Sequence, residues 1–338
     1  MRITIIGGGN IGTLMAAEMA HNGHSVTVYT KRADKWSKII KVLQPPNKEL
    51  MVATLQLVTS SLKEAVSEAD LIWVTVPASM FRSLSDDLLP LINDGQYLGI
   101  VPGSGGAEFA FYDLIQKGCI LFGLQRVHSI ARVLEYGHSV FMLGRKTELQ
   151  LSSIPKSKCD DISAITENLF HIPCRSLPCY LNLTLTPSNP ILHTTRLYSM
   201  FRNYDNKTIY PHNIRFYEEW DMSSSKSLIE ADEELQSFCK ILPFNLSAVI
   251  SLKEHYESDT VEAMTEKIRG INAFKGILSP MKEVSGGWQP DFSSRYFSSD
   301  FSYGLKVILE IAKAFDFPMP KLSSIWNWYK KLYSAPKK

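Results

Sequence analysis

The first twelve residues constrain the fold more than any other part of the chain. A short apolar run, residues 3–6, leads directly into the pattern Gly-x-Gly-x-x-Gly at residues 7–12. A helix-forming stretch rich in alanine and methionine follows at residues 13–21, and a second strand-like run comes after a glycine at residues 25–29. This order of strand, glycine turn, helix and strand predicts the first β-α-β unit of a Rossmann domain.

Each glycine of the pattern has its own role in a dinucleotide site. Gly7 permits the tight turn, Gly9 lets the backbone approach a pyrophosphate, and Gly12 lets the helix pack close to the strand. Asn10 and Ile11 begin the helix, where free N–H groups and the helix dipole attract phosphate. The alternative is a glycine-rich turn that binds nothing. The flanking strands and helix favour a nicotinamide dinucleotide.

The end of the second strand bears on which dinucleotide is bound. An acidic residue there would hydrogen-bond the ribose hydroxyls and repel a 2′-phosphate. The sequence instead reads Thr30-Lys31-Arg32, and the nearby acid, Asp34, falls past the usual position. A hydroxyl followed by two cations suits a phosphate dianion, so we expect NADP(H) to be favoured over NAD(H). The alternative is that both cations are solvated surface charges.

Two later apolar runs, residues 71–76 and 96–101, predict further parallel strands. In an open α/β sheet the ligand lies just beyond the carboxyl ends of the strands. Four more residues are therefore expected at the cofactor site: Val76, Pro77, Pro102 and Gly103.

The chain is long enough for two domains. We expect an α/β Rossmann domain with a parallel, doubly wound sheet at residues 1–178, followed by a mostly α-helical domain at 179–338. Segments 139–143 and 170–174 are candidates for late edge strands. Long amphipathic stretches predict helices in the second half, at residues 223–242, 259–272 and 303–315.

Composition excludes several classes of protein. A formal net charge of +2 gives no reason to expect a nucleic-acid partner or a membrane surface. No apolar run reaches the roughly 20 residues that span a bilayer. The odd number of cysteines argues against a disulfide framework, and no spacing suggests a metal site. We therefore expect a cytoplasmic protein without a metal.

Two segments of the second half carry a specific resemblance. The first, residues 186–193, reads Thr-Pro-Ser-Asn-Pro-Ile-Leu-His. The second, residues 291–305, contains Arg-Tyr-Phe-Ser-Ser-Asp and then Gly-Leu. Together with the glycine pattern, these segments resemble the opine dehydrogenases, the octopine/nopaline dehydrogenase family, over nearly the whole chain.

The resemblance implies an NAD(P)-dependent oxidoreductase that acts on CH–NH donors. A pyruvate-like 2-oxo acid and the amine of an amino acid would form an imine, which hydride transfer then reduces. The expected partners are thus small molecules, and the resemblance is compatible with a homodimer. The identities of the oxo acid and the amine, the product stereochemistry and the biological role stay open.

The same resemblance assigns roles to three residues. His193 matches the family's acid–base histidine, Asp300 its carboxylate partner, and Arg295 the cation that binds the carboxylate of the oxo acid. Asn189 and Trp288 are further candidates for substrate contact. Each has a structural alternative: His193 as a core histidine, Arg295 and Asp300 as an ion pair, Asp300 as a helix cap, Asn189 as a support for the histidine loop, and Trp288 as a packing residue.

Two other functions remain as alternatives. A 2-dehydropantoate-reductase-like or β-hydroxyacid dehydrogenase would use a lysine as its main acid–base group, and no lysine here lies in an equivalent motif. A non-catalytic NADPH-binding sensor predicts a damaged acid–base set, whereas His193, Arg295 and Asp300 are all present.

Overall fold

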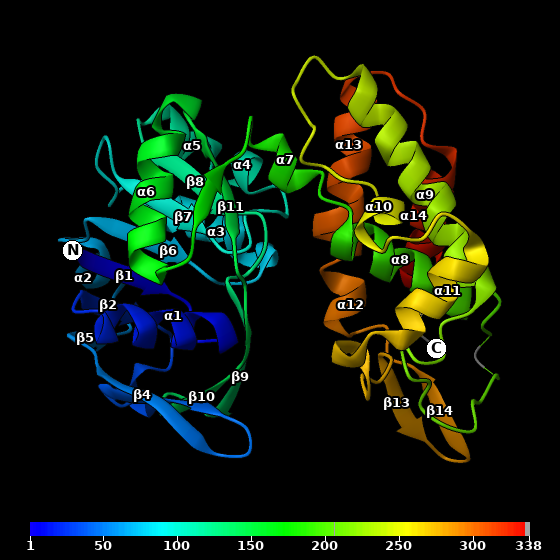
Figure 1. Ribbon diagram of the computed structural model, residues 1–338, viewed down its shortest axis with the longest axis horizontal. Coiled ribbons are helices and arrows are strands. Elements are labelled where there is room, and N and C mark those ends of the chain that lie inside the picture. Colours follow the sequence, from blue (N-terminus) through cyan, green and yellow to red (C-terminus); the bar gives the residue numbers. More distant parts are fainter. Residues whose placement is uncertain (206, 335–338) are drawn as a thin grey trace. The chain divides into compact units, whose positions relative to one another are not determined.

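A computed structural model describes residues 1–205 and 207–334 (Figure 1). The chain forms two compact units, Met1–Thr184 and a second unit from Leu185 onward. The division falls a few residues after position 178, where the sequence places the boundary. Each unit has its own architecture.

The main sheet of the first unit has the strand order β12-β11-β8-β7-β6-β1-β2-β5. Its strands are β1 (Arg2–Ile6), β2 (Ser25–Tyr29), β5 (Leu57–Thr59), β6 (Leu71–Val74), β7 (Tyr97–Ile100), β8 (Ile120–Leu124), β11 (Leu149–Ile154) and β12 (Cys174–Ser176). Pairing is parallel from β5 to β8, and β11 then runs antiparallel to β8. The predicted fold class, a Rossmann domain with a mostly parallel sheet, is confirmed.

Helices connect these strands. They are α1 (Asn10–His21), η1 (Ala33–Lys35), α2 (Leu62–Val66), η2 (Ala78–Met80), α3 (Phe81–Leu88), α4 (Ala107–Ala110), α5 (Tyr112–Gln116), η3 (Lys156–Lys158), α6 (Cys159–Phe170) and α7 (Leu181–Thr184). Strand β6, near the centre of the sheet, is apolar throughout, and all of its residues, Trp73 among them, are buried. Such continuous burial is expected of parallel strands covered on both faces.

A second sheet was not anticipated from the sequence. It has the order β4-β3-β10-β9, built from β3 (Ile39–Gln44), β4 (Lys48–Thr54), β9 (Ser129–Glu135) and β10 (Ser139–Arg145). The expectation of an edge strand at 139–143 was wrong, because β10 lies between β3 and β9. The expected strand at 170–174 was also misplaced: Phe170 ends α6, and β12 begins at Cys174.

The second unit is mostly helical, as predicted. Its elements are α8 (Ser188–Phe201), α9 (Met222–Ile241), α10 (Leu252–His255), α11 (Val261–Gly270), η4 (Asn272–Phe274), β13 (Met281–Val284), β14 (Gly287–Pro290), α12 (Arg295–Ser298), the π-helical turn η5 (Phe301–Leu305), α13 (Lys306–Ala314) and α14 (Pro320–Ser334). Helix α8 contacts α9, α12, η5 and α14. It therefore runs through the core of this unit, which explains why a residue on it, such as His193, is buried.

In the described part of the chain, no helix is long and apolar enough to cross a membrane. The cysteines at positions 119, 159, 174, 179 and 239 are free thiols.

Candidate functional site

The carboxyl ends of the central strands meet at one edge of the main sheet. The register pairs Ile6 with both Tyr29 and Val74, and pairs Val74 with Ile100. The residues that follow these strands therefore share that edge. They include the glycine turn, Thr30, Thr75 and the loop that begins at Val101, which is the usual ligand position in an open α/β sheet.

The glycine turn is built so tightly that two of its glycines admit no side chain. Gly7 has φ +120°, a left-handed backbone conformation that glycine tolerates and other residues rarely adopt. A Cβ on Gly12 would lie 1.9 Å from the carbonyl oxygen of Gly7. The hydroxyl of Thr75 donates to the carbonyls of Ile6 and Gly7, both at 3.2 Å, and so fastens the turn to β6.

Gly9 differs from the other two because the space beside it is open. No atom lies within 4 Å of the position that a Cβ would occupy. Gly9 is the N-cap of α1 and makes no side-chain cap, so the first N–H groups of a twelve-residue helix are left for a ligand. Asn10 accepts a hydrogen bond from the backbone N–H of Val133 at 2.8 Å, which fixes the helix start to β9. These features fit the pyrophosphate of a dinucleotide.

The residues after β2 form a cluster with the second sheet. The hydroxyl of Thr30 is 2.9 Å from that of Tyr136, and the Arg32 guanidinium lies 4.0 Å from the centre of the Tyr136 ring. Trp36 meets the edge of the same ring and packs on Gly8. Lys31 is exposed. The cluster places a cation, a hydroxyl and aromatic faces next to the glycine turn.

The remaining expected cofactor residues lie at the same sheet edge. Val76 and Pro77 follow β6, and Pro102 and Gly103 follow β7. Gly103 is buried, and a Cβ there would lie 2.8 Å from both the Cα of Gly123 and a methyl of Leu183. Close packing thus requires a glycine at this position.

A buried carboxyl lies next to this loop. Glu108 is in α4, and Thr184 donates a hydrogen bond to its Oε1. Within the described residues, Oε2 of Glu108 and the hydroxyl of Tyr180 have no hydrogen-bond partner. Burial raises the pKa of Glu108 to about 7, although the bond from Thr184 opposes the rise. The carboxyl therefore changes charge near neutral pH.

We expect Glu108→Gln to make the protein less sensitive to alkaline pH. The pKa of Glu108 in the folded protein lies above the ordinary 4.5. Its contribution to the free energy of unfolding therefore falls as pH rises from 4.5 through 7. The full loss above pH 7 is about 3 kcal/mol. Glutamine keeps the acceptor for Thr184 and has no charge to bury. Urea unfolding at pH 5.5 and pH 8 measures the difference, and the exposed Glu266→Gln is the control. An equal fall in stability for wild type and Glu108→Gln would contradict the expectation.

In the second unit, His193 lies on α8 with partners at both ring nitrogens. Nδ1 is 2.8 Å from Oδ2 of Asp300, and Nε2 is 3.0 Å from the hydroxyl of Tyr217. The ring also packs against Tyr296, with centroids 4.8 Å apart, and against the edge of Phe216. His193 is 9% exposed. The structure thus brings together the histidine and carboxylate that the sequence pairs.

The neutral ring has one tautomer that satisfies both contacts. An ionised carboxylate only accepts hydrogen bonds, so Nδ1 carries the proton and Nε2 accepts from Tyr217. Burial raises the pKa of Tyr217, helped by the nearby Tyr296, Tyr256 and Asp300, so its hydroxyl keeps its proton. This arrangement is able to take up and release a proton at Nε2.

The structural alternatives for Asp300 receive no support. Asp300 precedes η5 but makes no side-chain cap to it. Within the described residues it forms no ion pair with Arg295, which is exposed at the start of α12. The side chain of Asp300 is instead directed to the histidine.

The other expected substrate residues are not in contact with this pair. Asn189 is exposed on α8 one turn before His193, and residues four apart lie on the same helix face. Arg295 directly precedes Tyr296, which packs on the histidine ring. Trp288 lies on β14, where its backbone pairs with Tyr210.

Sequence reasoning missed Tyr136 and Tyr217. Tyr136 is far in sequence from Thr30 and Arg32, and Tyr217 lies in a turn without a motif. No local pattern marks either residue. In the described part of the chain, no group of three or more His, Cys, Asp or Glu residues is placed to hold a metal ion.

Comparison with known proteins finds two family profiles that match parts of this chain. The profile of the family described as "NAD/NADP octopine/nopaline dehydrogenase, alpha-helical domain" matches residues 176–333, and that of the "NAD-dependent glycerol-3-phosphate dehydrogenase N-terminus" matches residues 2–104. Tauropine dehydrogenase of Arabella iricolor is 25% identical, with 98% of this chain and 91% of the relative covered.

Solved structures show the same fold. Octopine dehydrogenase with NADH and L-arginine superposes with a TM-score of 0.87 at 23% identity, over 98% of this chain and 89% of that one. Octopine dehydrogenase with NADH and pyruvate gives 0.86 at 22% identity, over 99% and 89%.

Proposed function

We propose that this chain is an opine dehydrogenase, which condenses a 2-oxo acid with an amine and reduces the product with a nicotinamide cofactor. Among the similar proteins named above are a tauropine dehydrogenase and octopine dehydrogenase. Octopine dehydrogenase has been solved with pyruvate, a 2-oxo acid, and with L-arginine, an amino acid, which are the two kinds of substrate that this reaction joins. The observation that carries the proposal is the buried contact of His193 with Asp300 and Tyr217.

The reaction needs a group that moves protons near neutral pH. The amine must lose a proton before it attacks the carbonyl carbon, and the hydroxyl of the adduct must gain one to leave as water. His193 is suited to both steps at Nε2, because Asp300 accepts from Nδ1 and stabilises the charged ring. When bound, the reduced nicotinamide supplies the hydride to the imine carbon. Overall, one proton is consumed and water is released.

The substrate residues follow from chemistry and position. We assign the carboxylate of the oxo acid to Arg295, because its exposed guanidinium offers two parallel donors. Asn189 shares a helix face with His193 and offers an amide to the amine substrate. Trp288 is assigned to the apolar part of that substrate.

We also propose that NADP(H) is favoured over NAD(H). Support comes from the end of β2, which has a hydroxyl at Thr30, cations at Lys31 and Arg32, and the Tyr136 ring under the Arg32 guanidinium. A guanidinium held on an aromatic face loses little freedom when it binds a phosphate. A cytoplasmic location, a homodimer and the lack of a nucleic-acid partner stay predictions from the sequence.

Arg32→Ala tests the cofactor preference. We expect the ratio of kcat/KM with NADPH to that with NADH to fall about 10-fold or more, the value of a hydrogen bond to a charged group. Lys35→Ala removes a neighbouring exposed cation and is the matched control. An unchanged ratio in Arg32→Ala, or an equal fall in both variants, would remove the assignment.

The function itself is tested by omission. Purified protein is mixed with NADPH or NADH, pyruvate and single amino acids, and cofactor oxidation is followed while each component is left out in turn. We expect turnover only when the oxo acid and the amine are both present. Oxidation with the oxo acid alone would indicate a hydroxy-acid dehydrogenase. Tight cofactor binding without turnover over a wide panel would indicate a sensor.

A further inference from the structure

The hydroxyl of Tyr217 can pair with Nε2 of His193 in both charge states of the ring. The neutral ring accepts at Nε2, and the hydroxyl of Tyr217 donates to it across 3.0 Å. When the ring is protonated, Nε2 becomes a donor, and the same hydroxyl can turn and accept. Asp300 accepts from Nδ1 in both states. The ring can therefore change charge without leaving a buried nitrogen unpaired.

The ring of Tyr217 is held rigidly by aromatic contacts. It stacks on Phe274 with centroids 4.1 Å apart and planes 19° from parallel, and it lies nearly parallel to Trp220. Tyr217 is 5% exposed. These contacts hold the hydroxyl of Tyr217 close to Nε2 of His193.

The turn that carries Tyr217 is tied to the helix that carries His193. Arg196 lies three residues after His193 on α8 and is 2% exposed. Its Nε donates to the carbonyl of Phe216 at 3.1 Å and its Nη2 to that of Glu219 at 2.6 Å. These carbonyls flank Tyr217.

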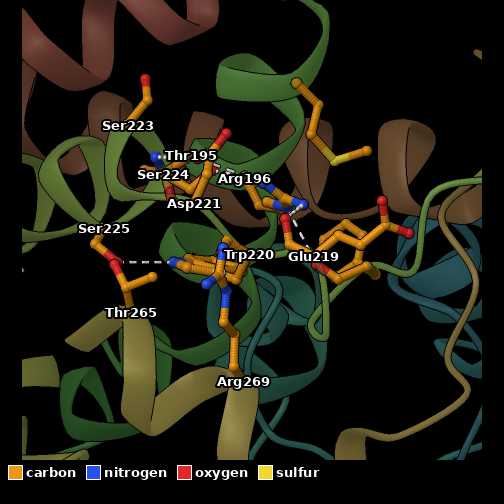
Figure 2. A network of polar contacts seen from close by, with 12 residues as sticks. Thr195, Arg196, Glu219, Trp220, Asp221, Ser223, Ser224, Ser225, Thr265 and Arg269 are labelled. Atoms are coloured by element: carbon orange, nitrogen blue, oxygen red, sulfur yellow. Dashed lines mark hydrogen bonds and ion pairs between the residues drawn. The ribbon is translucent and has the colours of Figure 1, made fainter. Parts of the chain in front are cut away.

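The network around Arg196 extends beyond these carbonyls. Figure 2 shows its guanidinium among Glu219, Trp220, Asp221 and Ser224. Its Nη1 donates to Ser224 at 2.9 Å and lies 3.6 Å from Asp221. From α11, Arg269 donates to the carbonyl of Trp220. The buried guanidinium thus joins α8 to the turn that carries Tyr217 and to the start of α9.

We propose that Tyr217 is a positioning residue of the acid–base centre, which pairs with Nε2 of His193 in both charge states while no substrate is bound and sets the pH at which the ring changes charge. This rests on the proposed function, in which His193 moves protons. The other titratable groups around the ring are Asp300 before η5, Tyr296 of α12 and Tyr256 beyond Tyr217; the cation on α8 is Arg196. Among these groups, Tyr217 is the one at Nε2.

The test is Tyr217→Phe, which removes the hydroxyl and keeps the stacked ring. The protonated ring loses an acceptor of a charge-assisted bond, which is stronger than the neutral bond lost by the uncharged ring. We therefore expect the titration midpoint of His193, followed by 15N NMR without substrates, to fall by about one pH unit. The acid limb of the kcat profile should move the same way, with KM for both substrates little changed.

Tyr198→Phe is the matched control, because Tyr198 is on the same helix and contacts Trp328 rather than His193. An unmoved midpoint in Tyr217→Phe, or an equal shift in Tyr198→Phe, overturns the proposal. If Tyr217→Phe does not fold, the wild-type spectrum decides: the proposal requires a proton on Nδ1 and a hydrogen-bonded, unprotonated Nε2 at high pH. Because NMR needs no turnover, its result is separate from failure of the proposed reaction.

Discussion

Replacing His193 by Gln will lower kcat for amine-dependent cofactor oxidation by about 10²–10⁴-fold, the range that a positioned acid–base group contributes. Glutamine is similar in size and retains a donor and an acceptor, but it cannot take up a proton near neutral pH. The contacts with Asp300 and Tyr217 show that the imidazole is held at both nitrogens. Steady-state kinetics with both substrates saturating measures the effect, because a loss in the proton-transfer steps appears in kcat.

The competing view of His193 as a core histidine makes a different prediction. A structural residue with two hydrogen bonds would cost stability when changed and leave kcat of the folded protein nearly intact. Unfolding by urea must therefore be measured beside the kinetics. Asp300→Asn is the companion variant, because the amide keeps the shape of the carboxylate but not its charge. A His193→Gln protein that is less stable yet turns over within tenfold of wild type would establish the structural view.

The sequence predicted those parts of the fold that depend on local pattern. The glycine turn and strand β2 can be read directly, since turn geometry and apolar runs are properties of adjacent residues. The second sheet could not be read. Strand β3 pairs in parallel with β10, about a hundred residues later, and Ile39, an apolar residue of β3, is exposed. Apolar residues on both faces of a strand hide the alternation that marks it.

The same distinction separates the predicted and the missed parts of the site. His193 and Asp300 were paired because each lies in a motif of a family, although 107 positions separate them. Tyr217 has no motif, and its place depends on the buried donors of Arg196. Tyr136 reaches Thr30 from a strand connection of the unanticipated sheet. Contacts between residues that are distant in the sequence and lie in no motif cannot be predicted from local sequence patterns.

Gly12→Ala will abolish cofactor binding and weaken the first unit. Alanine is ordinarily better than glycine inside a helix by about 1 kcal/mol. Here its methyl would lie 1.9 Å from the carbonyl oxygen of Gly7 and 2.6 Å from Oγ1 of Thr75. The carbonyl is part of the turn that Thr75 fastens to β6, so it cannot move alone. Forcing the helix away costs about 1–3 kcal/mol or more and displaces the N–H groups that face the phosphates.

Gly9→Ala separates cofactor binding from folding. Its methyl meets no protein atom within 4 Å, and its φ of −88° suits alanine. We expect stability within about 1 kcal/mol of wild type, the usual value of a cap change. The methyl nevertheless stands where backbone must approach a pyrophosphate, so the Kd for NADPH should rise at least about 10-fold. Calorimetric titration with NADPH and urea unfolding measure the two quantities. The methyl of Gly9→Ala would contact only a bound ligand and no protein atom. Unchanged affinity in this variant would therefore mean that the phosphates do not approach the turn.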